Sequence, residues 1–105
     1  MSTLESTPER ERRRAEQMSI GEIPGGTYRK WARRAPDHCD VDVAEAWHDA
    51  EPVHYPHSLI GAVARYHRES DMILIARQGA ITSCYSLMER PRGQRQYVRN
   101  QVSDQ

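Results

Sequence analysis

The stretch "ARYHRESDMILIARQGAITSCYSL", residues 64–87, contains three short apolar runs joined by two polar turns. The turn sequences are "RESD" and "RQG", and Gly79 in the second provides the positive φ that a tight hairpin needs. Apolar runs separated by such turns are typical of antiparallel strands. We therefore expect strands at 62–67, 72–77 and 80–87.

The run "MILIA" at 72–76 is apolar at every position, so both of its faces should be buried and it should be the central strand. A further short strand is expected at 53–55. The flanking residues Pro52 and Pro56 cannot donate backbone hydrogen bonds, which confines this strand to the edge of the sheet.

Two short helices are expected before the sheet. The first spans 27–35, with Thr27 as its cap, and Pro36 ends it; its apolar side chains at i, i+3, i+4 and i+7 are Tyr28, Trp31, Ala32 and Ala35. The second spans 41–50 and is capped by Asp40 or Asp42. The predicted fold is α+β: two short N-terminal helices packed on a three- to four-stranded antiparallel β-meander with flexible termini.

The chain divides into three parts in this interpretation. Residues 1–26 form a polar, basic arm or exposed helix (8–18) followed by a Gly/Pro linker, because no apolar stripe runs along them. Residues 27–88 form the single α+β domain. Residues 89–105 are basic and polar, and we expect a flexible or partly helical tail.

Length and composition limit the function classes. The chain has 105 residues, 37% hydrophobic and without Phe, which suits one small domain. No run is long enough to span a membrane, and the first residues, "MSTLESTPER", lack the apolar stretch of a signal peptide. The two cysteines are not spaced as metal ligands. These features predict a cytoplasmic protein with reduced thiols and no membrane partner.

Charge is unevenly distributed although the net charge is zero. Residues 1–36 carry eight basic and five acidic side chains, 37–64 carry six acidic side chains and no Lys or Arg, and 65–105 carry seven basic and four acidic ones. An RNA phosphate backbone could be bound by the basic residues near the predicted sheet, which are Arg29, Lys30, Arg33, Arg34, Arg65, Arg68 and Arg77. Alternatively, the acidic middle of the chain neutralises them internally.

The last strand carries many hydroxyls. A period of two places Ile81, Ser83, Tyr85 and Leu87 on one face, which we expect to be the core, and Thr82, Cys84 and Ser86 on a face open to water. An ordinary wet face of an antiparallel sheet explains this pattern. The functional alternative is that these hydroxyls, with His67 on the neighbouring strand, hold a phosphate or assist proton transfer.

His54 and His57 are spaced as two zinc ligands could be, but Pro56 lies between them and no second pair completes a four-ligand set. We interpret them as exposed loop histidines and expect no metal or other cofactor. A zinc-binding module ranks third among the possible functions.

The order of these parts resembles the barnase–EndoU–colicin–RelE group of small ribonuclease toxins. The matching segments are "YRKWARRAP", "DVDVAEAWHDA", "ARYH", "MILIAR" and "GAITSCY", within about residues 27–88. Gly79, Ile81, Ser83 and Tyr85 correspond to a last strand of the form G-x-I-x-T-x-Y, with Ser83 where the family usually has Thr. Several such toxins have a His in the first helix, where this chain has Tyr28 and Trp31.

The resemblance implies cleavage of RNA without a metal ion, by attack of a ribose 2′-OH on the adjacent phosphate. It assigns Ser83, Tyr85 and Arg34 to the catalytic site, and we add His67 as acid or base. Arg29, Lys30, Arg33, Arg65, Arg68 and Arg77 are then RNA-binding residues. The expected partners are RNA, including mRNA on the ribosome, and a protein that neutralises the toxin. The alternative is a non-enzymatic module that binds nucleic acid or another protein.

Overall fold

The computed structural model describes residues 7–57 and 61–102. Within these residues three helices precede four strands, and a 3₁₀ turn and a fourth helix follow the last strand. In order they are α1 (Pro8–Gln17), α2 (Gly25–Arg34), α3 (Val43–Asp49), β1 (Glu51–Val53), β2 (Val63–His67), β3 (Met72–Arg77), β4 (Ala80–Ser86), the 3₁₀ turn η1 (Leu87–Glu89) and α4 (Arg92–Val102).

The strands form one antiparallel sheet in the order β1-β2-β3-β4, so each strand pairs with its neighbour in sequence. This confirms the predicted α+β class and the antiparallel meander. β3 is an interior strand and is buried from Met72 to Ala76, as its apolar sequence predicts. β1 begins two residues earlier than expected, and Pro52 lies within it at the edge of the sheet.

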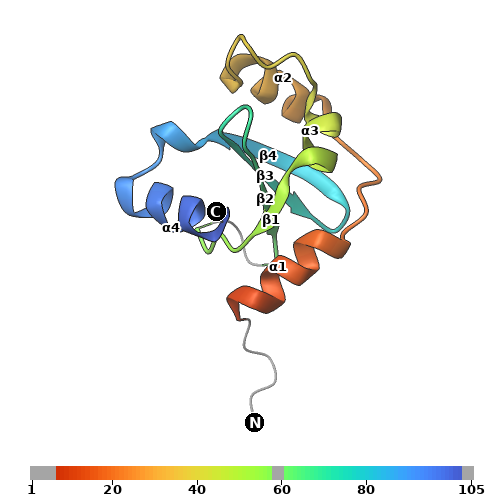
Figure 1. Cartoon of the computed structure of the whole chain (residues 1–105). Coiled ribbons are helices and arrows are strands. Elements are labelled where there is room, and N and C mark those ends of the chain that lie inside the picture. The colour runs from red at the N-terminus through yellow and green to blue at the C-terminus, as the bar shows by residue number, and fades with distance from the viewer. Residues whose placement is uncertain (1–6, 58–60, 103–105) are drawn as a thin grey trace.

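The sheet lies between two layers of helices (Figure 1). α1, α2 and α3 contribute Ala15, Trp31 and Trp47 to a core on one face of the sheet, where they pack with residues such as Leu74. α4 covers the other face, on which Val98 packs in a second core with Tyr66, Ile73 and Ile75. A sheet with both faces covered explains why β3 has no polar side.

Local signals fix the helix starts. Asp42 caps α3, because its Oδ1 accepts a hydrogen bond from the Glu45 amide at 3.0 Å. Thr7 caps the N-terminus of α1, because its Oγ1 accepts a hydrogen bond from Arg10 N at 3.1 Å. α2 begins at Gly25 after Pro24, so the expected cap at Thr27 is wrong. Thr27 lies inside the helix and is 2% exposed.

The two segments expected to be exposed or flexible contain helices that pack against the sheet. Ala15 of α1 is fully buried, and Met18 and Ile20 pack beside it. In α4, Val98 and Val102 are buried. One buried alanine in α1 and two buried valines in α4 form too weak an apolar stripe to be recognised in the sequence. They are nevertheless enough to pack these helices against an apolar face of the sheet. Residues 1–6 and 103–105 lie outside the described residues.

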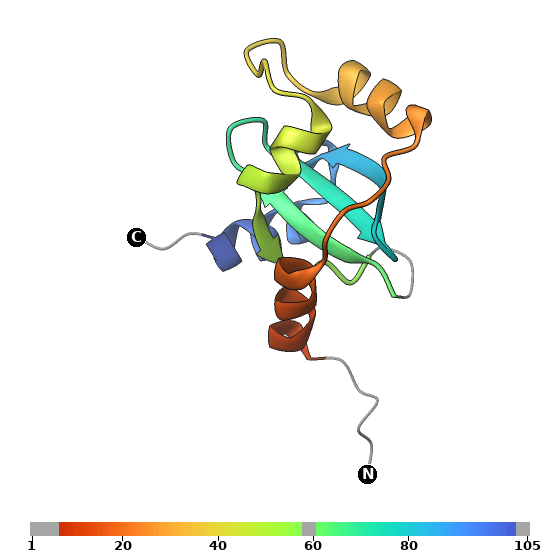
Figure 2. The ribbon, with the colours of Figure 1, turned by 90° about the vertical axis from the view of Figure 1, so that its right-hand side faces the viewer.

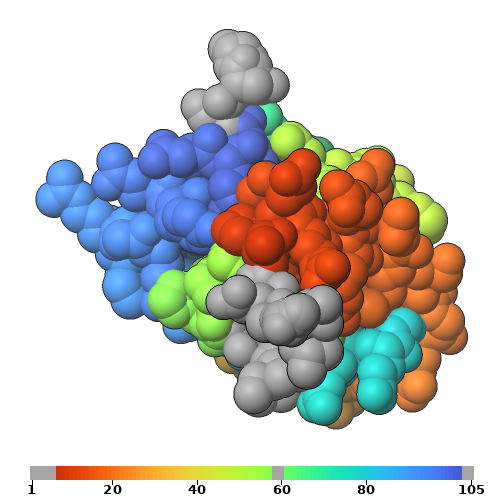
Figure 3. Space-filling view, turned by 90° about the horizontal axis from the view of Figure 1, so that it is seen from below, coloured from red at the N-terminus to blue at the C-terminus, as the bar shows by residue number. Residues whose placement is uncertain are grey.

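The segment between α1 and α2 runs along the sheet toward the β3–β4 hairpin (Figure 2). Gly21 N and Glu22 N donate to the Gly79 carbonyl at 2.8 and 3.2 Å, and Ile81 N donates to the Glu22 carbonyl at 3.2 Å. Gly79 has φ 82°, the positive value that the turn was expected to need. On the underside of the molecule α1 lies beside α4 (Figure 3), where Arg12 Nη1 donates to Gln101 Oε1 at 3.2 Å.

A register shift between β3 and β4 interrupts the regular alternation of β4 side chains between the two faces of the sheet. Ile81 pairs with Ala76 and Ser83 with Ile75, so Thr82 is an extra residue opposite that step of β3. Beyond the bulge, Cys84 falls on the face covered by α2 and α3 and is fully buried, whereas Tyr85 packs with the second core. Cys84 is therefore a core residue, and the expected wet face is wrong at that position.

Truncating Val98 tests whether α4 is a packed element. Val98→Ala removes buried methyl groups and leaves a cavity, so the free energy of unfolding should fall by about 2 kcal/mol in chemical denaturation. Gln96→Ala, at an exposed position of the same helix, is the control and should change it by less than about 0.5 kcal/mol. Equal values for the two variants would contradict the packing of α4.

Candidate functional site

α2 lies along β4, the strand at one edge of the sheet, whose outward carbonyls have no partner strand. Thr27 Oγ1 donates to the Ile81 carbonyl at 2.8 Å, and Arg34 Nη1 donates to the Cys84 carbonyl at 2.8 Å. Between them, Lys30 Nζ lies 3.5 Å from Ser83 Oγ. Spacings of three and four put these α2 residues on one helix face. That face both closes the edge of the sheet and places cations along it.

Two arginines contact the ring of Tyr85. The Arg34 guanidinium carbon lies 5.5 Å from the ring centroid and that of Arg90 lies 5.0 Å from it, which is cation–π distance. These three side chains, with Ser86 and Glu89, line a cavity of ≈ 150 Å³. Two guanidinium groups and a phenol hydroxyl at one small opening form a site that suits a phosphate group.

Arg90 was not predicted from the sequence. Its Nε lies 3.5 Å from Gln94 Oε1, an atom that also accepts a hydrogen bond from Tyr55 OH at 2.6 Å. Burial raises the pKa of Tyr55, which keeps its hydroxyl protonated as the donor. Arg90 falls in the segment expected to be flexible, and its place three residues after the predicted last strand (80–87) was the available signal.

Local electrostatics are positive beside β4. Burial raises the pKa of the Cys84 thiol, whereas Arg34, Lys30 and Arg33 all act to lower it. Glu89 is the acidic residue among those that line the cavity. The site is therefore built to attract an anion.

His67 does not reach this cavity. Its side chain is 3% exposed, Nδ1 lies 2.7 Å from Ser70 Oγ, and its ring packs edge-on against Trp31 with centroids 6.1 Å apart. An acid or base must come within hydrogen-bond reach of the substrate, and a ring enclosed in this way cannot. We therefore assign His67 a structural role and leave it out of the site.

The other predicted RNA-binding arginines are dispersed. Arg65 donates to backbone carbonyls of α1 and α3, and Arg68 pairs with Glu51, Nε to Oε2 at 2.5 Å, and donates to the Val102 carbonyl. Arg77 is exposed, but it pairs with Ala80 at the opposite end of the hairpin from Tyr85. The structure thus brings Arg34, Tyr85, Ser83 and Lys30 to one region, with Arg29 and Arg33 exposed on the same helix.

Residues 7–57 and 61–102 contain no group of three or more His, Cys, Asp and Glu side chains that could hold a metal ion. His54 Nδ1 lies 2.6 Å from Tyr97 OH, and burial lowers the pKa of this histidine. Within the same residues no helix is long and apolar enough to cross a membrane.

Comparison with known proteins identifies a family for this chain. A family model described as "Putative RelE superfamily toxin domain" matches residues 24–88, more than half of the chain. The chain therefore belongs to this family of RelE-superfamily toxin domains. The matched region includes Arg34 and Tyr85 but ends before Arg90 and α4. No curated protein and no solved structure matches the chain.

Thr27→Val tests how α2 is held on β4. The substitution keeps the shape of the side chain but removes the hydroxyl, so the buried Ile81 carbonyl loses its donor. The free energy of unfolding should fall by about 1 to 3 kcal/mol. Thr82→Val makes the same change at an exposed position of β4 and should have little effect. If chemical denaturation gives equal stabilities for both variants, the Thr27 bond does not hold α2.

Proposed function

We propose that the protein is a RelE-like toxin-type endoribonuclease that cleaves RNA without a metal ion at the cavity between α2 and η1. The observation that carries this proposal is the pair of guanidinium groups that contact Tyr85, 5.5 and 5.0 Å from the centroid of its ring. Membership in a toxin family supports it independently.

The scissile phosphate binds between Arg34 and Arg90, and their charges stabilise the oxyanions that develop as the reaction proceeds. The ribose 2′-OH attacks the phosphorus, and the bond from phosphorus to the 5′ oxygen of the next nucleotide breaks. The products are a 2′,3′-cyclic phosphate and a free 5′-OH. The 2′-OH loses one proton, and the leaving oxygen gains one.

Glu89 and Tyr85 provide those two proton transfers. The Glu89 carboxylate lines the cavity and accepts the proton of the 2′-OH, and the Tyr85 hydroxyl supplies a proton to the leaving oxygen. Ser83 and Lys30, whose polar atoms lie 3.5 Å apart, bind the neighbouring phosphate. Arg29 and Arg33, exposed on α2, contact the RNA strand farther from the cut.

The targets in this proposal are cytoplasmic RNAs, including mRNA on the ribosome. A ribonuclease of this type must be held in check by a partner, and the positive charge around the cavity fits an acidic segment of a neutralising protein. The competing proposal is a module that binds RNA without cutting it. The observation that favours it is the burial of His67, which leaves the cavity without a histidine among the residues that line it.

A cleavage assay with purified protein distinguishes the two proposals. Wild type should cut an RNA oligonucleotide in the presence of a chelator, leaving a 2′,3′-cyclic phosphate, and a 2′-deoxy substitution at the cut site should abolish the reaction. Arg34→Gln should lower kcat/KM about 10²- to 10³-fold. Tyr85→Phe and Glu89→Gln should each lower it about 10²- to 10⁴-fold.

The matched control is Arg77→Gln, which removes an exposed arginine from the far end of the same hairpin and should retain cleavage. Expression of the wild type alone should arrest growth, and the Arg34→Gln variant should relieve the arrest at equal protein level. Salt-dependent RNA binding by a folded wild type that makes no cut would establish the binding module in place of the enzyme.

A further inference from the structure

α4 presents a second basic surface that lies outside the matched family region. Arg92, Arg95 and Arg99 are spaced by three and four residues and so share one face of the helix. With Gln96 and Asn100 they line a shallow depression of ≈ 340 Å³. We call these five residues the arginine face of α4. The helix contains no acidic residue.

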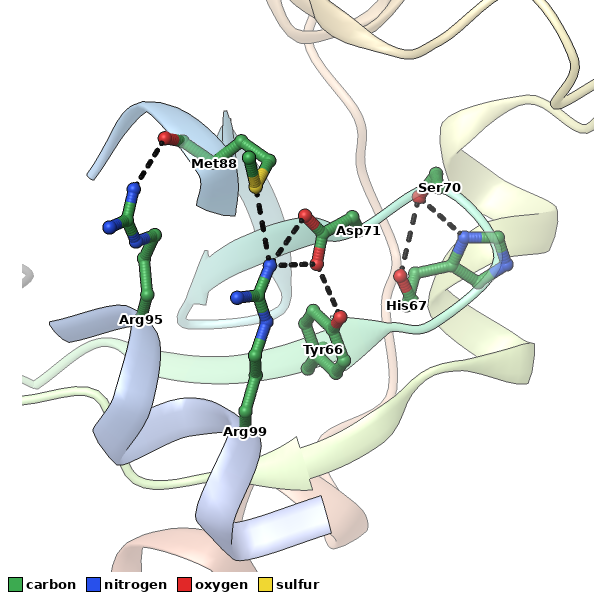
Figure 4. Close-up of polar contacts among 7 residues, drawn as sticks. All are labelled: Tyr66, His67, Ser70, Asp71, Met88, Arg95 and Arg99. Carbon is green, nitrogen blue, oxygen red and sulfur yellow. Dashed lines mark hydrogen bonds and ion pairs between the residues drawn. The ribbon is translucent and has the colours of Figure 1, made fainter. Parts of the chain in front are cut away.

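Contacts of neighbouring α4 residues, and one of Arg99 itself, hold the arginine face in place. Val98 and Val102 are buried on the sheet, and Gln101 Nε2 donates to the His54 carbonyl at 2.9 Å. Arg99 Nη2 lies 3.1 Å from Asp71 Oδ2 (Figure 4). Packing of α4 on the sheet fixes the backbone from which these cations project, so the spacing between them is set before an anion binds.

Asp71 is itself fixed at the β2–β3 turn, with φ 58°. It accepts a hydrogen bond from Tyr66 OH (Figure 4). Burial and this bond raise the pKa of Tyr66 to about 12, so the hydroxyl remains a donor at neutral pH. The turn and Tyr66 therefore hold the carboxylate where it contacts Arg99.

Most of the charge on this face is unneutralised. Asp71 offsets Arg99, whereas Arg92 and Arg95 have no ion pair with any residue of 7–57 or 61–102. Arg95 Nη1 donates to the Met88 carbonyl at 3.2 Å, which orients the side chain without neutralising it (Figure 4). Two uncompensated guanidinium groups on one helix face, one of them oriented by a hydrogen bond, indicate a binding surface for an anion.

The composition of the depression selects the kind of anion. Its lining consists of arginine, glutamine and asparagine and contains no apolar side chain. Protein interfaces are usually anchored by buried aromatic or aliphatic residues, which this surface lacks. Guanidinium groups bind phosphates in a bidentate manner, and amide side chains can bond to ribose and base edges. The chemistry fits a nucleic-acid strand better than an acidic peptide.

The arginine face also begins next to the cavity. Arg90 lines the cavity, and Arg92 follows two residues later at the start of α4. From Arg92 to Arg99 the helix rises about 10 Å. At about 3.4 Å per charge of a stacked strand, that length covers about three phosphates.

We propose that the arginine face of α4 is an RNA-binding exosite, which holds the phosphate backbone of the strand that leaves the cavity. This inference rests on the proposed function only in that the cavity holds the scissile phosphate. The exosite increases affinity for long RNA and leaves the chemical step unchanged.

The test compares wild type with Arg92→Gln/Arg95→Gln. Binding is measured by fluorescence anisotropy with a labelled 12-nucleotide RNA that carries a 2′-deoxy cut site, over a series of salt concentrations. The variant should bind about tenfold more weakly at low salt, and the slope of log K against log salt should become shallower by about 1.4, or about 0.7 for each lost contact. Cleavage of a dinucleotide, which reaches only the cavity, should be unchanged.

The matched control is Arg10→Gln/Arg13→Gln, which removes two charges from exposed positions of α1 and should retain both affinity and slope. Arg92→Lys/Arg95→Lys keeps the charges and should retain the slope. An α4 variant that folds and binds long RNA with wild-type affinity and slope would overturn the exosite. If wild type binds the 12-nucleotide RNA through α4 but cleaves neither the dinucleotide nor the same 12-nucleotide sequence with every 2′-OH in place, the proposed function fails and the binding surface stands.

Discussion

The guanidinium group of Arg65 joins the helical layer to the sheet. From β2, its Nε and Nη2 donate to the Ala15 carbonyl at 3.0 and 2.9 Å, and its Nη1 donates to the Trp47 carbonyl at 2.8 Å. Its carbon lies 4.2 Å from the Trp47 ring. One cation therefore binds carbonyls at the C-terminal ends of both α1 and α3, where a positive charge is also favoured by the helix dipoles.

The position of the cavity depends on the contacts of Arg65, because the chain that follows α1 leads to α2. The end of α1 leads into the segment that bonds to Gly79, and that segment delivers α2 to the edge of β4. At the edge, the bulge at Thr82 decides which side chains face which layer: Cys84 enters the core beneath α2, and Tyr85 turns toward the side of α4. Arg34 can then reach the Cys84 carbonyl and the Tyr85 ring at once.

The features that depend on residues close together in the sequence were predicted correctly. The hairpin at Gly79, the interior strand 72–77 and the Asp42 cap follow from turn chemistry, a two-sided apolar run and a capping spacing. The bulge at Thr82 and the burial of Arg65 and His67 depend on partners far along the chain, and a period of two or a count of arginines cannot reveal them. Arg34 and Tyr85 were predicted through a family resemblance, whereas Arg90 and α4 lie beyond the region which that resemblance covers.

The distribution of ion pairs shows whether the acidic middle of the chain neutralises the basic residues near the sheet. Among the described residues, the ion pairs join Glu9 to Arg13, Glu11 to Arg14, Glu51 to Arg68 and Asp71 to Arg99. None of them involves a cation of α2. The acidic side chains of residues 37–49 thus leave the charges of α2 available. Because Arg34 of α2 lines the cavity and α4 begins two residues after Arg90, which also lines it, the uncompensated positive charge is concentrated where an RNA strand would have to lie.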